Sequence, residues 1–527
     1  MSRKKKIRRL VLILGDQLNR DSAVFDEFDS EQDLVWMAEV EHEIERVWSH
    51  QTRIVLFLSA MRHFRDEMKA DGLPVIYHQL FSNPDRERGS TFSEILADDL
   101  RQWDPDQVTV VQPGDEAVMT SLSQTVKSSG RHLEVLEDRH FFISPDDFRK
   151  YASGRKSLRL EFFYRELRKR TGVLMDQDGK PIGGKWNFDH ENRESFGKGG
   201  PGGIPGCDRP ALDDTTREVM ELVRSRFGSH PGRIDQFDWP VTRKQGLRRL
   251  DFFVEHLLPH FGEFEDAMWT DEPTLFHSRL SVPLNLKLIS PRECVDRALE
   301  AYKTGHAPLN SVEGFIRQVL GWREFIRGVY WLLMPEYGNR NHLDQLAELP
   351  SFFWDGETEM NCVRQSMKHV LDLAYSHHIH RLMVLGNLSL LLGVHPHRFH
   401  EWHMAMYADA VDWVSLPNTL GMSQFGDGGV VGTKPYCCSG NYINKMSNFC
   451  SNCRFDHRQR TGPDACPVTT LYWDFLDRQS DRLKDNQRMK FAFKNLDRMR
   501  ADSESFGELR WQAEQLRKDW DVHPQDS

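Results

Sequence analysis

The sequence predicts an α/β domain built on a parallel sheet, followed by a larger all-helical domain with a cysteine-rich region. Short apolar strands alternate with helical stretches from residue 10 to about 140, which is typical of a parallel sheet covered by helices. From about residue 212 onward, apolar residues recur at helical spacing instead. Six of the eight cysteines lie between Cys362 and Cys466. A chain of 527 residues is long enough for two or three domains.

The composition is that of an ordinary globular protein. The chain is 39% hydrophobic and 28% charged, with a net charge of -10. It has no run of about 18 apolar residues that could span a membrane. The basic start, residues 1–9, leads into an apolar run too short for a secretory signal. We therefore expect a cytoplasmic monomer whose cysteines are reduced thiols or metal ligands.

Residues 1–140 form the expected Rossmann-like α/β domain. Buried strands are predicted at residues 10–14, 34–38, 75–78 and 108–111, with helices such as residues 53–69 between them. In such sheets the ligand lies at the carboxyl ends of the strands. Asp16 follows the first strand and Asp115 the fourth, so a ligand site is expected there. Neither turn has a G-x-G-x-x-G fingerprint, which argues against an NAD-type dinucleotide.

Residues 141–211 are expected to connect the two domains. Residues 149–170 hold nine Lys/Arg against two Asp/Glu, interleaved with aromatic residues. Such a segment is either a solvated helix face or a local phosphate-binding face. A Gly/Pro-rich stretch follows, with six glycines in residues 197–206, and is typical of an interdomain loop.

Residues 212–506 form the predicted helical domain, which is large enough to enclose a cofactor between helices. Helical spacing is found at residues 215–227, 242–258, 293–302, 311–333, 361–373 and 380–392. Residues 507–527 are charged and have weak periodicity, so we expect a tail there.

Four cysteines have a spacing that suits one metal centre. Cys450 and Cys453 form a C-x-x-C pair, and Cys466 follows thirteen positions later before a proline. Cys362 stands upstream on a predicted helix. Four thiolates could close a zinc site or hold an iron–sulfur cluster, and the Cys-Pro at the last position slightly favours the cluster. The alternative is a redox pair beside structural thiols. The remaining cysteines are expected to be structural: Cys207, Cys294, Cys437 and Cys438.

Charged residues and histidines also stand in apolar helical stretches. Arg323 must have a partner there, either a carboxylate or a cofactor, because an unpaired buried guanidinium is costly. The same argument applies to Arg381 and Asp409. His377 and His378 are adjacent and would point about 100° apart on a helix, so at most one of them faces a given cavity.

These residues carry a resemblance to a known family. Its most specific part is the spacing of the four cysteines combined with residues 375–383, and it extends from residues 12–18 to 472–475. The chain resembles the prokaryotic iron–sulfur branch of the cryptochrome/photolyase family, the bacterial (6-4) photolyases and their cryptochrome-like relatives. The resemblance implies light-driven repair of (6-4) pyrimidine-pyrimidone photoproducts in UV-damaged DNA. It also implies FAD and a 4Fe-4S cluster held by the four cysteines.

The resemblance implies a set of FAD contacts: His277, Ser278, Leu280, Ser281, Arg323, Arg381, Asp409 and Ser415. Residues 277–281 resemble the photolyase element that contacts the FAD phosphates, although a serine-rich helix start is usually an ordinary N-cap. Arg381 and Asp409 would form an ion pair beneath the flavin ring. A purely structural buried pair is compatible with the same residues.

The first domain resembles the antenna domain of the family. In this branch it holds 6,7-dimethyl-8-ribityllumazine, which Asp16, Glu43 and Asp115 would contact. A carboxylate at the end of a strand is otherwise often a loop cap.

The resemblance also implies a catalytic histidine, an electron route and DNA contacts. His378 occupies the position of the catalytic histidine of (6-4) photolyases, and histidine can donate a proton near neutral pH. Trp354 and Trp402 correspond to the photoreduction route. The connection lies near the lesion-binding face in relatives, so phosphate contacts are expected from Lys180, Lys185 and Arg193.

Two positions depart from the family pattern. Ser415 stands where relatives place Asn or an acidic residue against flavin N5, and His403 stands where they often have Tyr. Both favour a rival function, a cryptochrome-like blue-light photoreceptor or regulator with little or no repair. His378 and the basic segment favour repair. A third hypothesis, a zinc-stabilised helical scaffold, would be supported by bound zinc without flavin.

Overall fold

The sheet of the amino-terminal domain has five parallel strands. In the computed structural model, which describes residues 6–207 and 209–521, they are β1 (Arg9–Leu12), β2 (Asp33–Ala38), β3 (Val75–His78), β4 (Gln107–Val111) and β5 (Leu133–Leu136). Their order is β3-β2-β1-β4-β5, so β1 lies between β2 and β4. This confirms the predicted parallel sheet and adds β5, which the sequence pattern did not reveal. Most of the basic start, residues 1–5, lies outside the described residues.

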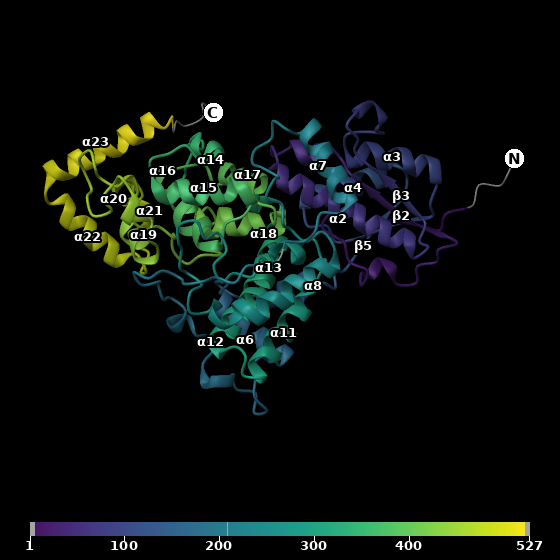
Figure 1. The fold of residues 1–527 in the computed structure, drawn as a ribbon, viewed down its shortest axis with the longest axis horizontal. Coiled ribbons are helices and arrows are strands. Elements are labelled where there is room, and N and C mark those ends of the chain that lie inside the picture. Colours follow the sequence, from purple (N-terminus) through teal and green to yellow (C-terminus); the bar gives the residue numbers. More distant parts are fainter. Residues whose placement is uncertain (1–5, 208, 522–527) are drawn as a thin grey trace.

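Alternation along the strands divides the core of this domain into two layers. Val11 and Val35 face one side and pack with α2 (Gln51–Ala70) and α7 (Asp214–Arg226). Leu10 and Trp36 face the other side, beneath α3 (Phe92–Trp103) and α4 (Glu116–Ser128). Successive side chains of a strand point to opposite faces, so one apolar run serves both layers. Figure 1 shows α2, α3, α4 and α7 gathered around the sheet.

Helix α7 begins just beyond the domain boundary predicted near residue 212. A boundary at residue 212 would place α7 in the helical domain, but α7 packs against α2. Val219, Val223 and Phe227 belong to the core of the α/β layer, and so does Trp239 in the following loop. The apolar face of a helix does not reveal which partner it will cover, so a local pattern cannot assign α7 to one domain or the other.

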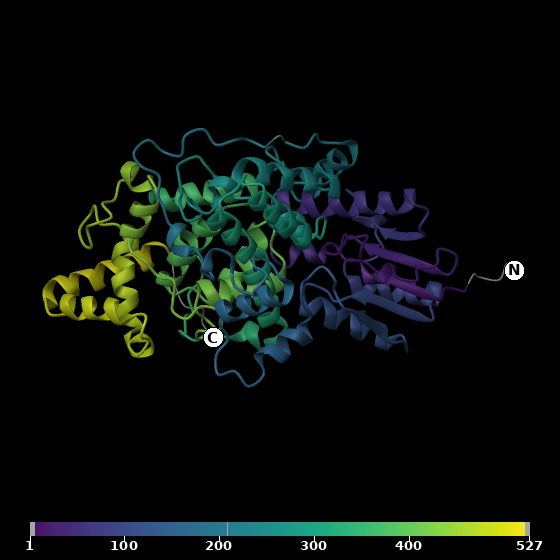
Figure 2. The ribbon, with the colours of Figure 1, turned by 90° about the horizontal axis from the view of Figure 1, so that it is seen from below.

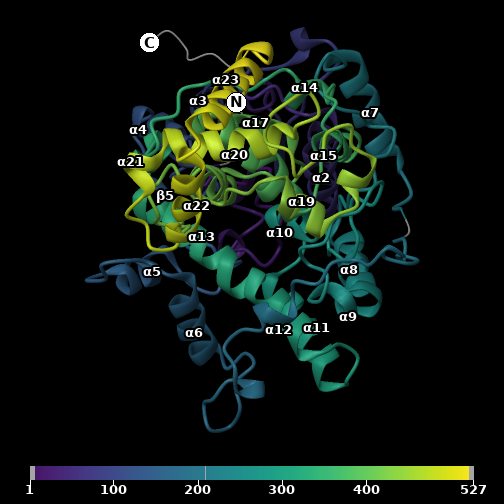
Figure 3. The same ribbon diagram turned by 90° about the vertical axis from the view of Figure 1, so that its left-hand side faces the viewer.

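The connecting segment begins with two helices, α5 (Pro145–Ala152) and α6 (Leu160–Thr171). Phe148 and Phe163 pack against Phe325 of α13 (Arg323–Leu333), which fixes both helices to the helical domain. Residues 172–207 are mostly loop, with 3-10 turns at residues 182–184 and 189–191. Figure 3 shows α5 at the left of the molecule and α6 at its lower left.

The other helices are α1 (His42–Glu45), α8 (Arg243–Phe252), α9 (Leu258–Phe261), α10 (Ser281–Asn285), α11 (Pro291–Lys303), α12 (Leu309–Ile316), α14 (Phe352–Asp355), α15 (Asn361–Leu373), α16 (Asn387–Leu392), α17 (Pro396–Met406), α18 (Asp412–Leu416), α19 (Gly440–Met446), α20 (Pro467–Arg478), α21 (Ser480–Leu483), α22 (Lys490–Arg500) and α23 (Ser503–Asp519). One helical core joins α11–α13 to α5 and α6, and another joins α14–α17 to α20–α23.

Wider π-helical turns include η6 (Arg317–Trp322), η8 (His380–Gly386) and η9 (Pro417–Ser423). Such turns are frequent at functional sites. Within residues 6–207 and 209–521, no helix is both long and apolar enough to cross a membrane.

The carboxyl-terminal residues are helical as far as Asp519, where a charged tail was expected from residue 507. Phe506, Leu509 and Ala513 are buried, and α23 packs against α20 and α22. Three apolar residues on one face are enough to dock a helix whose other faces are charged. Figures 1 and 2 show these helices at the end of the molecule opposite the sheet. The last part of the expected tail, residues 522–527, lies outside the described residues.

Candidate functional site

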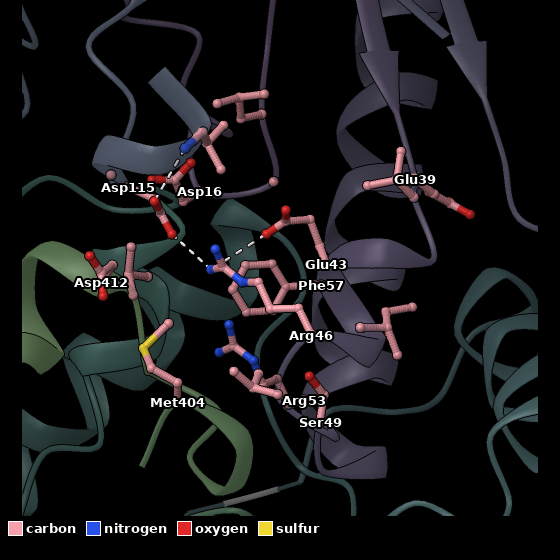
Figure 4. Close-up of a pocket in the computed structure, with 18 of the residues that line it drawn as sticks. Asp16, Glu39, Glu43, Arg46, Ser49, Arg53, Phe57, Asp115, Met404 and Asp412 are labelled. Carbon is pink, nitrogen blue, oxygen red and sulfur yellow. Dashed lines mark hydrogen bonds and ion pairs between the residues drawn. The ribbon is translucent and has the colours of Figure 1, made fainter. Parts of the chain in front are cut away.

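A cavity opens at the carboxyl ends of the central strands. Asp16, Glu43 and Asp115, the residues that the sequence associates with an antenna chromophore, all line it. Figure 4 shows Asp16 close to Asp115, with Glu43 farther to the right and with Asp412 and Met404 of the helical domain below Asp115. The cavity is lined by residues of both domains, and part of it is open to solvent. The structure therefore brings the three predicted residues together around one cavity.

Arg46 organises the acidic side of this cavity. Its guanidinium lies 2.7 Å from Asp115 Oδ2 and 3.6 Å from Glu43 Oε2 (Figure 4). Asp115 also caps α4, so the loop-cap interpretation and a role in the cavity both hold for it. Burial raises the pKa of Asp16, and its Oδ2 has no hydrogen-bond partner among the described residues. A buried carboxyl oxygen without a hydrogen-bond partner is available to bind a polar atom of a ligand.

Sequence reasoning missed Arg46, Arg53 and Phe57 in this cavity. Arg53 lies over the Phe57 ring at 4.5 Å and donates to the backbone oxygen of Ala410 at 2.6 Å. It thereby links the sheet domain to the helical domain. The i, i+4 spacing of Arg53 and Phe57 on the helix is the pattern that could have indicated a shared face.

A buried ion pair lies in the helical domain. Arg381 Nη1 and Nη2 contact the two oxygens of Asp409 at 2.9 and 3.1 Å. Burial opposes ionisation of Asp409, but the attraction of Arg381 keeps its pKa below the ordinary range, and Ser281 donates a further hydrogen bond. Arg381 also stacks over Tyr407 at 4.0 Å. Three predicted residues, Ser281, Arg381 and Asp409, are thus brought together.

The segment of residues 277–281 forms a tight turn before α10. Arg279 has a left-handed backbone, with φ of 53°, and both ends of its guanidinium contact Asp238 at 2.6 Å. The Ser278 hydroxyl accepts from the Leu280 N–H at 3.3 Å. This pairing holds the turn in one conformation, with the two serine side chains half-buried. Sequence analysis did not assign this anchoring role to Arg279.

Arg323 begins α13 and packs beside two aromatic rings. It lies 4.1 Å from the centre of Phe141 and 5.1 Å from that of Trp413. Glu324 is 3.6 Å away, but no guanidinium nitrogen of Arg323 has a hydrogen-bond partner among the described residues. Burial lowers the pKa of Arg323 to about 10 and raises that of Glu324 to about 7. Glu324 is therefore the expected carboxylate partner, and the N–H groups of Arg323 remain available to hydrogen-bond a polar ligand.

Ser415 and His403, the two departures from the family pattern, are both buried. Ser415 Oγ and His403 Nδ1 have no hydrogen-bond partner within the described part of the chain. The His403 ring lies 4.4 Å from Tyr407, the ring that Arg381 covers. Buried polar atoms that lack a hydrogen-bond partner, such as these two, are compatible with contacts to a bound polar heterocycle.

The adjacent histidines diverge as expected from their spacing. His377 is buried, whereas the side chain of His378 is 49% exposed. His378 Nε2 lies 3.5 Å from Asp266 Oδ1. The His277 ring stacks on His377 at 4.4 Å and meets His378 edge-on at 5.2 Å. His277, expected at the FAD phosphates, therefore lies beside the candidate catalytic histidine.

Aromatic rings lead from the Arg381 region toward the surface. Trp402 is buried, donates to the Phe353 backbone oxygen at 2.7 Å and lies 5.7 Å from Tyr407. Trp354 follows Phe353 in the chain and packs on the exposed Trp48 at 5.3 Å. Both predicted tryptophans are therefore in this region, and sequence analysis missed Tyr407 and Trp48.

Cys362, Cys450, Cys453 and Cys466 line one small cavity. Cys362 comes from α15, and Cys466 caps the start of α20. Burial raises the pKa of Cys362, and the other three sulfurs raise it further. Thiols that disfavour each other's ionisation are the arrangement that a shared cation stabilises. The four cysteines predicted from spacing thus converge, and their donor set fits either zinc or an iron–sulfur cluster.

The predicted DNA contacts lie on the surface of the connecting segment. Lys180, Lys185 and Arg193 are all exposed. Trp186 stands between them, with Arg165 and Lys169 of α6 over its ring at 5.3 and 5.6 Å. Trp186 of this loop therefore adds an aromatic ring to the cationic surface of α6.

Comparisons with known proteins show close relatives in sequence. Residues 11–239 match the deoxyribodipyrimidine photo-lyase-related protein family. The (6-4) photolyase of Agrobacterium fabrum is 42% identical over 499 residues, which cover 94% of this chain and 96% of that protein. The uncharacterised protein R855 of Acanthamoeba polyphaga mimivirus is 32% identical over 122 residues, 23% of this chain and 90% of that protein.

Solved structures share the fold at lower identity. A bacterial class III photolyase from Agrobacterium tumefaciens superposes with a TM-score of 0.55 at 15% identity, covering 84% of this chain and 86% of that one. A cryptochrome from Synechocystis gives a TM-score of 0.52 at 13% identity, with coverages of 91% and 94%. These likenesses concern the fold alone. The nearly full-length match to the Agrobacterium fabrum protein shows that this chain belongs to the cryptochrome/photolyase family, on the branch of the bacterial (6-4) photolyases.

Proposed function

We propose that this protein repairs (6-4) pyrimidine-pyrimidone photoproducts in UV-damaged DNA in a light-driven reaction. The observation that carries the proposal is the position of His378. It is the accessible member of a histidine group whose other rings are buried. The nearly full-length relative is named a (6-4) photolyase, which makes this chemistry the first to test.

The proposed cofactor is FAD, and the open polar atoms of the helical domain fit it. The hydroxyls of Ser278 and Ser281 would contact its phosphates, and the Arg381–Asp409 pair would lie beneath its ring. Ser415 Oγ, buried and without a partner among the described residues, would approach a ring nitrogen. When bound, FAD supplies light absorption and a transferable electron.

The side chains of this protein then have two tasks, to hold the lesion and to move a proton. A damaged dinucleotide must leave the base stack to reach a pocket, which costs little where the lesion already disrupts pairing. Lys180, Lys185 and Arg193 would hold the DNA backbone by contacts to phosphates. His378 would donate the proton that the pyrimidine needs, and Asp266, 3.5 Å away, would orient its ring.

Two further groups complete the proposal. The four cysteines would hold a 4Fe-4S cluster with a mainly structural role, because their donor set suits it. The cavity beside Asp16, Glu43 and Asp115 would hold 6,7-dimethyl-8-ribityllumazine as the antenna. We further propose that the protein acts as a cytoplasmic monomer.

A second candidate function is blue-light sensing with little or no repair. Ser415 and His403 favour it, because both alter the polar surroundings expected of the flavin. A photoreceptor would bind and reduce FAD in light but leave the photoproduct intact.

The test is anaerobic blue-light repair of an oligonucleotide with a single (6-4) photoproduct. We expect conversion by the native protein and a loss of about 10²- to 10⁴-fold in His378→Ala, the usual contribution of a general acid. His397→Ala is the matched control, because the His397 side chain is 47% exposed on another helix. No conversion despite bound and reducible FAD would favour the photoreceptor.

A further inference from the structure

The rings of His277, His377 and His378 pack against one another, and His378 is the exposed member of the three. His277 comes from the turn before α10, whereas His377 and His378 follow α15. The His277 ring centre lies 4.4 Å from that of His377 and 5.2 Å from that of His378. One ring nitrogen from each histidine lies within 4.8 Å of the other two. Segments about 100 residues apart thus bring three candidate nitrogen ligands close together.

The two buried rings of this group have nitrogens that the described residues leave unpartnered. His277 is 8% exposed and its Nε2 has no partner; His377 is 2% exposed and neither of its nitrogens has one. A buried polar atom without a hydrogen bond costs about 1–3 kcal/mol, and native proteins rarely tolerate several together. The arrangement therefore calls for a further partner at this point.

The chemistry of these nitrogens favours a metal ion as that partner. The free nitrogens of His277 and His377 are buried, and an imidazole nitrogen without a hydrogen on it offers a lone pair to a cation. Neutral imidazole is the commonest ligand of zinc and of neighbouring transition metals. Zinc–nitrogen bonds of about 2.0–2.1 Å place tetrahedral ligands about 3.4 Å apart. The planes of the stacked His277 and His377 rings lie 13° apart, so binding requires one of these rings to turn its lone pair toward the ion and His378 to approach it.

We propose that His277, His377 and His378 bind one first-row transition metal ion, of which Zn²⁺ is the simplest probe. The site is separate from the four cysteines, because the rings of His380 and Phe449 intervene. His377 lies 4.1 Å from His380, which lies 5.9 Å from Phe449. Asp266 would act as an outer partner, holding the His378 ring in place.

Metal binding has a consequence for the proposed reaction. A lone pair of His378 that is donated to a metal ion can no longer carry a proton, so the metal-bound protein would be unable to protonate the lesion. Free transition metal would thereby inhibit repair reversibly. This consequence rests on the proposed function, whereas metal binding itself does not.

The binding test uses the intact protein with its cofactors. Zn²⁺ is titrated by calorimetry, and zinc-edge X-ray absorption then identifies the ligands. We expect one ion with only nitrogen and oxygen neighbours, at about 2.0–2.1 Å. His378→Gln, at an exposed position that should not disturb folding, and His277→Gln should each weaken binding at least tenfold, about 1.4 kcal/mol. His397→Gln is the control and should bind as the native protein does.

Two results would overturn the site. Sulfur neighbours at about 2.3 Å would place the ion on the cysteines, and equal weakening in all three variants would indicate adventitious binding. The repair assay then tests the consequence separately. Zn²⁺ should slow the native protein and chelator should restore it. A native protein that binds Zn²⁺ through histidine and repairs at an unchanged rate would disprove inhibition and leave the site standing.

Discussion

Arg381 and Asp409 form a two-point ion pair, with nitrogen–oxygen distances of 2.9 and 3.1 Å, that joins η8 to the turn between α17 and α18. The same guanidinium covers the Tyr407 ring, and Tyr407 touches both His403 and Trp402. The pair therefore connects the candidate flavin contacts to the aromatic rings that lead outward. The ion pair can stabilise the fold and can also contact a ligand, and mutation can separate these two roles.

Removing one partner of this pair should destabilise the protein strongly. Asp409→Asn leaves the Arg381 charge buried without its counter-ion, so we expect a loss of about 3–5 kcal/mol in the free energy of unfolding. The double variant Arg381→Met/Asp409→Leu removes both charges and should recover most of that loss. Neither variant should retain flavin. Denaturant unfolding and flavin absorbance measure the two effects, and full flavin content in the double variant would show that the pair is structural only.

Much of the fold follows from sequence pattern, because strands and helices were visible wherever apolar periodicity was strong. The edge strand β5 was missed because Leu133–Leu136 is short and partly exposed, so its alternation is weak. The position of α7 depends on packing against α2, a tertiary contact that no local pattern encodes. The convergence of the cysteines was predictable from spacing and family resemblance. The approach of His277 to His378 was not, because it depends on how two distant turns are folded.

The cysteine centre should be lost when any one ligand is removed. Cys453→Ser is expected to abolish iron binding and lower stability, because the binding free energy of a structural metal centre contributes to folding. Cys437→Ser is the matched control, since Cys437 lies in the same region but does not line the cavity. Iron and acid-labile sulfide analysis measure the outcome. Zinc in place of iron in the native protein would contradict the cluster and support the zinc-stabilised scaffold.

Trp402 should be required for efficient photoreduction of bound flavin. It lies between Phe353 and Tyr407, so Trp402→Phe interrupts the aromatic route and also removes the hydrogen bond to the Phe353 backbone oxygen. We expect the rate of light-driven reduction to fall at least tenfold, about 1.4 kcal/mol in barrier height. Trp103→Phe, at the exposed end of α3, should reduce normally. An unchanged rate in a Trp402→Phe protein with full flavin content would exclude this route.

Acidification should destabilise the protein through His50, whose two ring nitrogens are both engaged in the neutral form. Nδ1 accepts from the Thr52 N–H at the start of α2, and Nε2 lies 3.0 Å from the Leu371 backbone oxygen at the end of α15. Burial lowers the pKa of His50 to about 4, although the hydrogen bond to the Leu371 backbone oxygen acts in the opposite direction. The unfolded chain takes up the proton near pH 6.5, so stability is complete above that pH and falls as the pH drops from 6.5 toward 4.

The expected loss from His50 is about 1.4 kcal/mol for each pH unit in that window. His50→Asn should keep the helix cap, because Asn accepts the same backbone hydrogen bond, but it has no group that titrates. Denaturant unfolding at pH 7.5, 6.5 and 5.5, measured on both proteins, separates this contribution from the other buried histidines, which the two share. A native protein whose stability falls no faster than that of His50→Asn between pH 6.5 and 5.5 would show that burial does not hold the imidazole neutral.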